Sequence, residues 1–172
     1  MSAVVLSRAI NGLAAEVVRV EVKIIPGLPK LTIVGLPDAV VRESKERVRC
    51  ALVSCGYSYP SRKITVSLAP ADIPKDGGRY DLPIALGILL ASKQIRVADI
   101  ERYECMGELS LSGQIQPVGN VFNSVIKAQQ HKRALIIPAE DQDDILIAPK
   151  NPVYGAKHLL EVCMHLEGKK PL

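Results

Sequence analysis

The most uniformly apolar stretch of the chain is residues 82–91, a run of Leu, Ile, Ala, Pro and Gly without a charged or hydrogen-bonding side chain. A helix with no polar face is typical of a domain centre. Before it, apolar and polar positions alternate over residues 64–68, which predicts a strand, and the prolines and glycines of residues 70–78 predict a chain-reversing loop. Asp81 is placed to cap the helix, and Pro83 suits its first turn. The pattern therefore predicts a strand, a loop and a buried central helix.

The flanking segments show weaker patterns of the same two kinds. Apolar and polar residues nearly alternate over residues 15–25, which predicts a strand with one solvent-exposed face. A tight turn at Asn11-Gly12 is predicted to join it to an antiparallel strand over residues 3–9. Asp38 and Gly56 mark the start and end of a helix over residues 37–55. Its apolar stripe holds Val40, Val41, Val48, Ala51, Leu52 and Cys55. The other predicted elements are a strand at 30–34, a hairpin of 103–109 with 114–118, a helix at 121–131, a strand at 134–137 and a helix at 154–166 starting near Ala156.

Composition favours a single globular domain. With 172 residues and 48% hydrophobic content, the chain can bury one sizeable core, which we place at residues 1–167, followed by the start of a linker at 168–172. One Phe, no Trp and five Tyr weaken the idea of a base-stacking nucleic-acid platform. The net charge of +4 permits nucleic acid as a partner, but does not argue for it alone.

No metal site or membrane segment is expected. The four cysteines, Cys50, Cys55, Cys105 and Cys163, form no CxxC pair and have no His in ligand spacing, so zinc is not predicted. The acidic residues of 139–147 lack the spacing of a calcium loop and predict an exposed turn. No signal segment opens the chain, and no apolar run reaches the roughly 18 residues of a membrane span. We expect a cytoplasmic protein with free thiols.

The loop before the central helix carries two candidate anion-binding residues. Lys75 and Arg79 flank Gly77 and Gly78, so positive charge, an approachable backbone and a helix N-terminus would come together for a phosphate or carboxylate. The alternative is a solvent-facing turn whose cations pair with Asp72 or Asp76. The residues alone leave both interpretations open.

Two further basic clusters each have two interpretations, a phosphate-binding surface or an ordinary solvated part of a helix. The wet face of the first helix carries Arg42, Glu43, Lys45, Glu46, Arg47 and Arg49. Arg42 with Glu46, and Glu43 with Arg47, are spaced for i,i+4 pairing, which favours a solvated face, while the excess of cations allows phosphate contact. A second cluster, Lys127, His131, Lys132 and Arg133, ends a predicted helix, where cations also complement the helix dipole.

Three stretches carry a resemblance to a known family. They are VGLPDAVVRESKERVRCAL at residues 34–52, APADIPKDGGRYDLPIALGIL at 69–89 and GELSLSGQIQPVGNV at 107–121. In this order they resemble the N-terminal domain of the ComM/YifB family of magnesium-chelatase-like proteins. That domain is also similar to the proteolytic domain of Lon and the C-terminal domain of RadA. The resemblance implies an α/β, ribosomal-protein domain 2-like fold, a two-layer arrangement of a mixed sheet and packed helices.

The Lon likeness raises the question of a Ser-Lys peptidase. Lon-type enzymes hold their Ser in KDGPSAG and their Lys in PxGGxxxK, whereas this chain reads KDGGRYD at residues 75–81 and PVGNVFNS at 117–124. Arg79 thus stands at the serine position and Ser124 at the lysine position. A guanidinium cannot attack a carbonyl, and a hydroxyl is no general base near neutral pH. A local Ser124–Lys127 couple is a weak substitute, so no catalytic residue is predicted.

The resemblance also implies where the whole protein acts. No GxxxxGK[ST] loop occurs, so this chain is expected to bind no cofactor, with ATP and Mg²⁺ bound by an AAA+ module after Leu172. Family members are implied to be hexameric helicases for DNA branch migration in natural transformation. We expect a non-catalytic domain that contacts DNA through Lys75, Arg79, Arg42, Lys45 and Arg49, with Lys127, Lys132 and Arg133 as weaker candidates. The alternative is a pure oligomerisation module of the ring.

Overall fold

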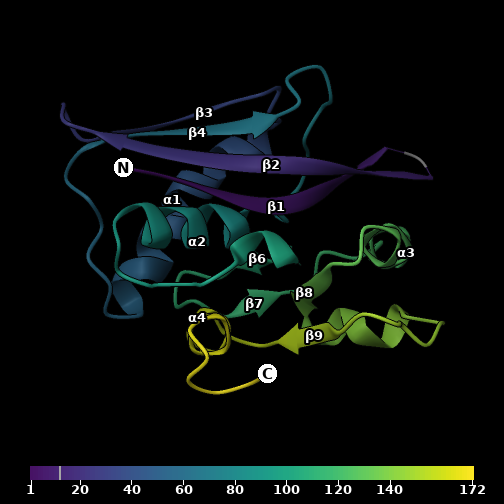
Figure 1. The fold of residues 1–172 in the computed structure, drawn as a ribbon. Coiled ribbons are helices and arrows are strands. Elements are labelled where there is room, and N and C mark those ends of the chain that lie inside the picture. The colour runs from purple at the N-terminus through teal and green to yellow at the C-terminus, as the bar shows by residue number, and fades with distance from the viewer. Residues whose placement is uncertain (12) are drawn as a thin grey trace.

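A seven-stranded mixed sheet organises the molecule (Figure 1). The computed structural model describes residues 1–11 and 13–172, and the strand order is β3-β4-β2-β1-β5-β8-β9. The strands are β1 Ser2–Asn11, β2 Ala14–Ile25, β3 Lys30–Val34, β4 Lys63–Ala69, β5 Tyr103–Cys105, β8 Ala134–Pro138 and β9 Val153–Ala156. Two short strands, β6 Glu108–Leu109 and β7 Ile115–Gln116, form a separate hairpin. The predicted mixed-sheet α/β class is confirmed.

Four α-helices of the described residues pack around this sheet. They are α1 Ala39–Ser54, α2 Asp81–Ala91, α3 Phe122–Gln130 and α4 Leu159–Leu166, with 3₁₀ turns at Ile100–Arg102 and Ala139–Asp144. In Figure 1, α1 and α2 lie on the same side of β1–β4, with α2 against β1 and β2 and α1 packed on α2. In the part of the chain that the structure describes, no helix has both the length and the apolar character needed to cross a membrane.

Strand pairing follows the alternation of the sequence. β1 and β2 pair antiparallel over ten positions, with Val5 opposite Val20, which confirms the antiparallel start. The Asn11-Gly12 turn cannot be described in full, because Gly12 lies outside the described residues. β4 runs antiparallel to β2 and parallel to β3. The parallel β3–β4 pair needs a crossover, and α1 supplies it.

The core is centred on α2, as the sequence predicted. All residues of α2 except Leu90 are buried, α2 contacts β1 and β2, and Val5, Val22 and Val66 of the sheet belong to the same core cluster. An added Cβ on Gly87 would lie 2.5 Å from Val22 Cγ2, so a glycine is needed for α2 to approach the sheet this closely. Gly87 therefore occurs inside a helix because there is no room for a side chain, and not because the backbone needs a conformation that only glycine adopts.

Several local predictions were wrong. Asp81 is the first residue of α2 and makes no cap contact, because its carboxylate is bound elsewhere in the core. The C-terminal segment predicted as one helix begins with β9, since Tyr154 pairs with Ile136 of β8, and α4 starts only at Leu159. Val40 is exposed on α1, where Ser44 takes the buried position. The segment predicted as one strand at 103–109 is interrupted between β5 and β6.

Candidate functional site

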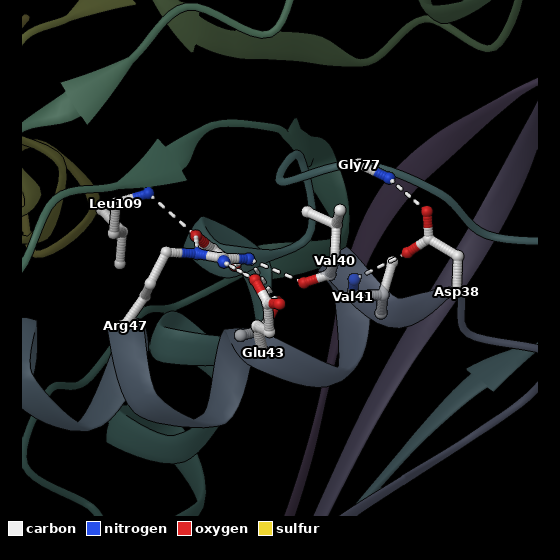
Figure 2. A network of polar contacts seen from close by, with 9 residues as sticks. Asp38, Val40, Val41, Glu43, Arg47, Gly77 and Leu109 are labelled. Carbon is white, nitrogen blue, oxygen red and sulfur yellow. Dashed lines mark hydrogen bonds and ion pairs between the residues drawn. The ribbon is translucent and has the colours of Figure 1, made fainter.

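Asp81 joins three elements through a buried network beside the central loop, and Figure 2 labels its partners Arg47 and Leu109. Its Oδ1 accepts from Ser44 Oγ at 2.5 Å, and its Oδ2 accepts from Arg47 Nε at 2.7 Å and from the Leu109 backbone N–H at 3.0 Å. Burial raises the pKa of the Asp81 carboxyl, and the hydrogen bonds from Arg47 and Ser44 oppose that rise. The network fixes α1 against the start of α2 and against β6.

The N-terminus of α1 holds the glycine loop in place. Asp38 caps α1 at the predicted start of the helix, because its Oδ1 accepts from the Val41 N–H at 2.7 Å. Its second oxygen accepts from the Gly77 N–H at 3.3 Å, and its own N–H donates to the Lys75 carbonyl at 2.9 Å. Figure 2 shows Asp38 between Val41 and Gly77. One aspartate therefore both starts the helix and anchors the loop.

Lys75 lies inside the protein. The residue has no exposed surface, and its Nζ donates to the carbonyls of Gly35, at 2.8 Å, and of Pro70. Burial lowers the pKa of this ammonium, because the charged form loses its hydration. Both interpretations of the loop assumed an exposed lysine, and the structure instead gives Lys75 a structural contact that leaves it no surface for a phosphate.

Arg79 is also largely buried, at 7% exposed. Its Nη1 lies 3.9 Å from Met106 Sδ, and its Nη2 donates to the Gly119 carbonyl at 3.4 Å. Burial lowers the pKa of the guanidinium. The side chain borders a hollow of about 390 Å³ that Asp76 and Glu108 also line. The prediction of a solvent-facing turn is therefore wrong for Arg79. The negative charges of Asp76 and Glu108 in the hollow would repel an anion.

The degenerate dyad positions offer no peptidase chemistry. Arg79 contacts the loop of residues 117–120, which Asp141 holds by accepting from the Val118 and Gly119 N–H groups at 2.8 and 3.2 Å. Ser124 is fully buried, and its Oγ has no hydrogen-bond partner within the described residues. Lys127 therefore does not activate it here. Asp141, predicted to be exposed, is buried because it holds this loop.

The exposed cations of the first helix form a continuous face. Arg42, Lys45 and Arg49 are all exposed, and at i, i+3 and i+7 they follow one side of α1. None of the three has a carboxylate within 4.0 Å among residues 1–11 and 13–172, so the expected Arg42–Glu46 pair is not formed. Glu43 does pair with Arg47, at 3.4 Å. We call Arg42, Lys45 and Arg49 the α1 basic face.

The second cluster is partly internal. Arg133 Nη1 lies 3.1 Å from Glu104 Oε1, and Glu104 Oε2 accepts from Arg8 Nε at 2.6 Å. Arg8 and Glu104 are both buried, and Arg8 Nη2 lies 2.7 Å from His131 Nδ1. This network engages Arg133, while Lys132 remains exposed and Lys127 is half-buried. Arg8 and Glu104 were not predicted from the sequence. The signal that could have found them is a single charged residue within a mainly apolar strand, β1 for Arg8 and β5 for Glu104.

Comparison with known proteins identifies the family. Residues 20–141 match the sequence pattern of the family described as subunit ChlI of Mg-chelatase. The chain belongs to the ChlI family. It is 44% identical over 170 residues to the uncharacterised protein YifB of Salmonella typhimurium, covering 99% of this chain and 34% of YifB. It is 43% identical over 170 residues to the competence protein ComM of Haemophilus influenzae, covering 99% of this chain and 33% of ComM.

This ChlI-family chain thus spans about a third of the length of its curated relatives. A weaker likeness connects it to the Lon protease of Brevibacillus choshinensis, at 27% identity over 184 aligned positions, covering 95% of this chain and 23% of Lon. The resemblance to ComM and YifB, and the Lon-like fold, are confirmed. Because Arg79 replaces the serine and Ser124 replaces the lysine, the Lon likeness extends to the fold and not to the dyad.

Proposed function

We propose that this chain is the non-catalytic N-terminal domain of a ComM-like AAA+ protein that moves DNA branches, and that its α1 basic face contacts the phosphate backbone. The observation that carries the proposal is the set of three exposed cations on one side of α1, each without a carboxylate partner in the described structure. Unpaired cations neutralise phosphates and release counterions, and such contacts position nucleic acid without reading its sequence. The similarity to ComM, a competence protein, supports a DNA-related role.

Nucleotide chemistry belongs, in this proposal, to the rest of the protein. ATP and Mg²⁺ would need a glycine loop with a free lysine and a Ser/Thr hydroxyl. The glycine loop of this chain does not fit, because Lys75 Nζ is already bound to two backbone carbonyls. An AAA+ module beyond this domain would supply ATP hydrolysis, and this domain would help to hold DNA against a ring.

Subunit contact is the second candidate function. Leu36 and Val40, near the start of α1, are 55% and 39% exposed, and Leu28 is 86% exposed. Exposed apolar side chains suit the centre of a protein interface, which is more apolar than its rim. In this alternative, the domain contributes to ring or hexamer assembly, and the α1 basic face binds an acidic patch of a neighbouring subunit.

The salt dependence of DNA binding tests the proposal. Three phosphate contacts contribute about 2.7 units to the slope of log affinity against log salt, which is a loss of about 40-fold between roughly 50 and 200 mM. We therefore expect the combined variant Arg42→Ala, Lys45→Ala, Arg49→Ala to lower the slope by about 2.7 units. Fluorescence anisotropy with labelled DNA across a salt series measures it.

A charge-matched control separates the α1 basic face from net charge. The variant Lys23→Ala, Arg96→Ala, Lys150→Ala removes three exposed cations that lie outside this face. It should bind DNA with nearly the slope of the wild type. Equal slopes for both triple variants, or no binding by the wild type at low salt, would leave subunit assembly as the role of the domain.

A further inference from the structure

A polar groove lies next to the α1 basic face. Its cavity of about 550 Å³ lies between the second half of α1, the start of β3 and the loop of residues 57–61. Lys45 and Arg49 line it from α1, Lys30 from β3, and Tyr57 and Tyr59 from the loop. We call this cavity the tyrosine groove. It extends the α1 basic face toward the edge of the sheet.

The wall of the tyrosine groove is positively charged. Lys30, Lys45 and Arg49 have no carboxylate within 4.0 Å in the described part of the chain, and Glu46 is the one acid in the wall. Cations that no nearby carboxylate neutralises retain their attraction for an external anion. The charge of the groove therefore favours a ligand that carries a series of negative charges.

Two aromatic rings stand among these cations. Tyr57 and Tyr59 are half-buried, and the Arg49 guanidinium lies 5.6 Å from the centroid of the Tyr59 ring. Burial raises the pKa of both phenols, so both remain neutral near physiological pH. The scarcity of aromatics argued against a stacking platform, yet two of the five tyrosines line the same groove as three cations that have no carboxylate partner in the described structure.

A site that combines aromatic rings with cations favours single-stranded nucleic acid over a duplex. A single strand offers base faces that stack on aromatic side chains while its phosphates meet Lys and Arg. A duplex keeps its base faces stacked inside and presents mainly phosphates. β3 also lies at the sheet edge, where its outer backbone groups have no strand partner in the described sheet and remain available for further hydrogen bonds.

We infer that the tyrosine groove is a binding site for single-stranded nucleic acid, with phosphates at Lys30, Lys45 and Arg49 and a base stacked at Tyr59, whose ring has the Arg49 guanidinium over one face. The inference rests on the proposed DNA contact and adds to it a preference for unpaired strands. Lys30 and Tyr59 are specific to the groove, because neither belongs to the α1 basic face. They therefore allow the groove to be tested separately from that face.

The test compares an oligothymidine with a duplex of the same length in anisotropy titrations at low salt. Loss of one base–ring stack weakens binding by about 5- to 150-fold. We expect this loss for Tyr59→Leu with the single strand, and little change with the duplex. Tyr59→Phe keeps the ring and should bind like the wild type. Lys30→Ala should lower the single-strand salt slope by about 0.7 units.

Each outcome decides the inference. Tyr59 also packs against the core, so thermal melting of both Tyr59 variants accompanies the titrations, and Lys30→Ala gives an answer even if Tyr59→Leu unfolds. Equal binding of single strand and duplex, unchanged by Lys30→Ala and by Tyr59→Leu, overturns the groove and leaves the α1 basic face. No binding of either DNA overturns both proposals. Binding of an extended acidic peptide in place of the oligonucleotide would make the groove a polypeptide site.

Discussion

Asp81→Ala is expected to lower the free energy of unfolding by about 3–5 kcal/mol, the usual result of removing one partner from a buried charge pair. The substitution leaves the Ser44 hydroxyl and the Leu109 N–H without their acceptor, and each buried unsatisfied donor costs about 1–3 kcal/mol. It also removes the 2.7 Å contact to Arg47. Urea denaturation measures the loss as a shift of the midpoint at constant slope.

Glu43→Ala is the matched control, because Glu43 is the other acid bound to Arg47. Its side chain is 69% exposed and its contact is 3.4 Å long, so its removal should cost no more than about 1 kcal/mol. A similar loss for Glu43→Ala and Asp81→Ala would show that the burial of Asp81, and its hydrogen bonds from Ser44 and Leu109, contribute little. The network would then not be what fixes α1 to α2.

Glu104→Ala is expected to have a comparable effect at the other side of the sheet. Glu104 is fully buried and binds Arg8, which is 1% exposed, so the substitution leaves an almost fully buried guanidinium without its carboxylate. Arg8 would keep its 2.6 Å bond to the Ala15 carbonyl, which does not neutralise charge. We expect a loss of about 3–5 kcal/mol in the free energy of unfolding, measured by urea denaturation.

The control for Glu104 is Glu101→Ala. Glu101 pairs with Arg19 at 3.9 Å, and both side chains are more than half exposed, so the expected loss is below about 1 kcal/mol. The double variant Arg8→Met, Glu104→Leu removes both charges and should recover much of the stability lost in Glu104→Ala. If the double variant is as unstable as Glu104→Ala, packing volume rather than unpaired charge determines the loss.

Much of the fold follows from local patterns. The alternation of β4, the apolar run of α2 and the Asp38 and Gly56 boundaries of α1 each act over a few residues, and the structure confirms them. β9 was missed because four residues with a central glycine carry little strand signal until β8 offers them a partner. Pairing with a neighbour, rather than local propensity, determines that segment.

The candidate site was less predictable because its contacts are long-range. Capping rules assigned Asp81 to its own helix, but its partner Arg47 is 34 positions away, and Glu104 meets Arg8 across 96 positions. Lys75 has the composition of a solvated loop, and only the fold brings the Gly35 and Pro70 carbonyls to its Nζ. The α1 basic face was predictable, since helical spacing alone places Arg42, Lys45 and Arg49 together.

The central claim is that DNA phosphates meet the α1 basic face and the groove beside it, and mapping of amide chemical shifts during a DNA titration tests it most directly. The account predicts that single-stranded DNA shifts the amides of residues 42–49 and 57–61, and that added salt reverses these shifts. Lys132 and its neighbours should change little. Shifts confined to residues 127–133, or none at all at low salt, would contradict the claim.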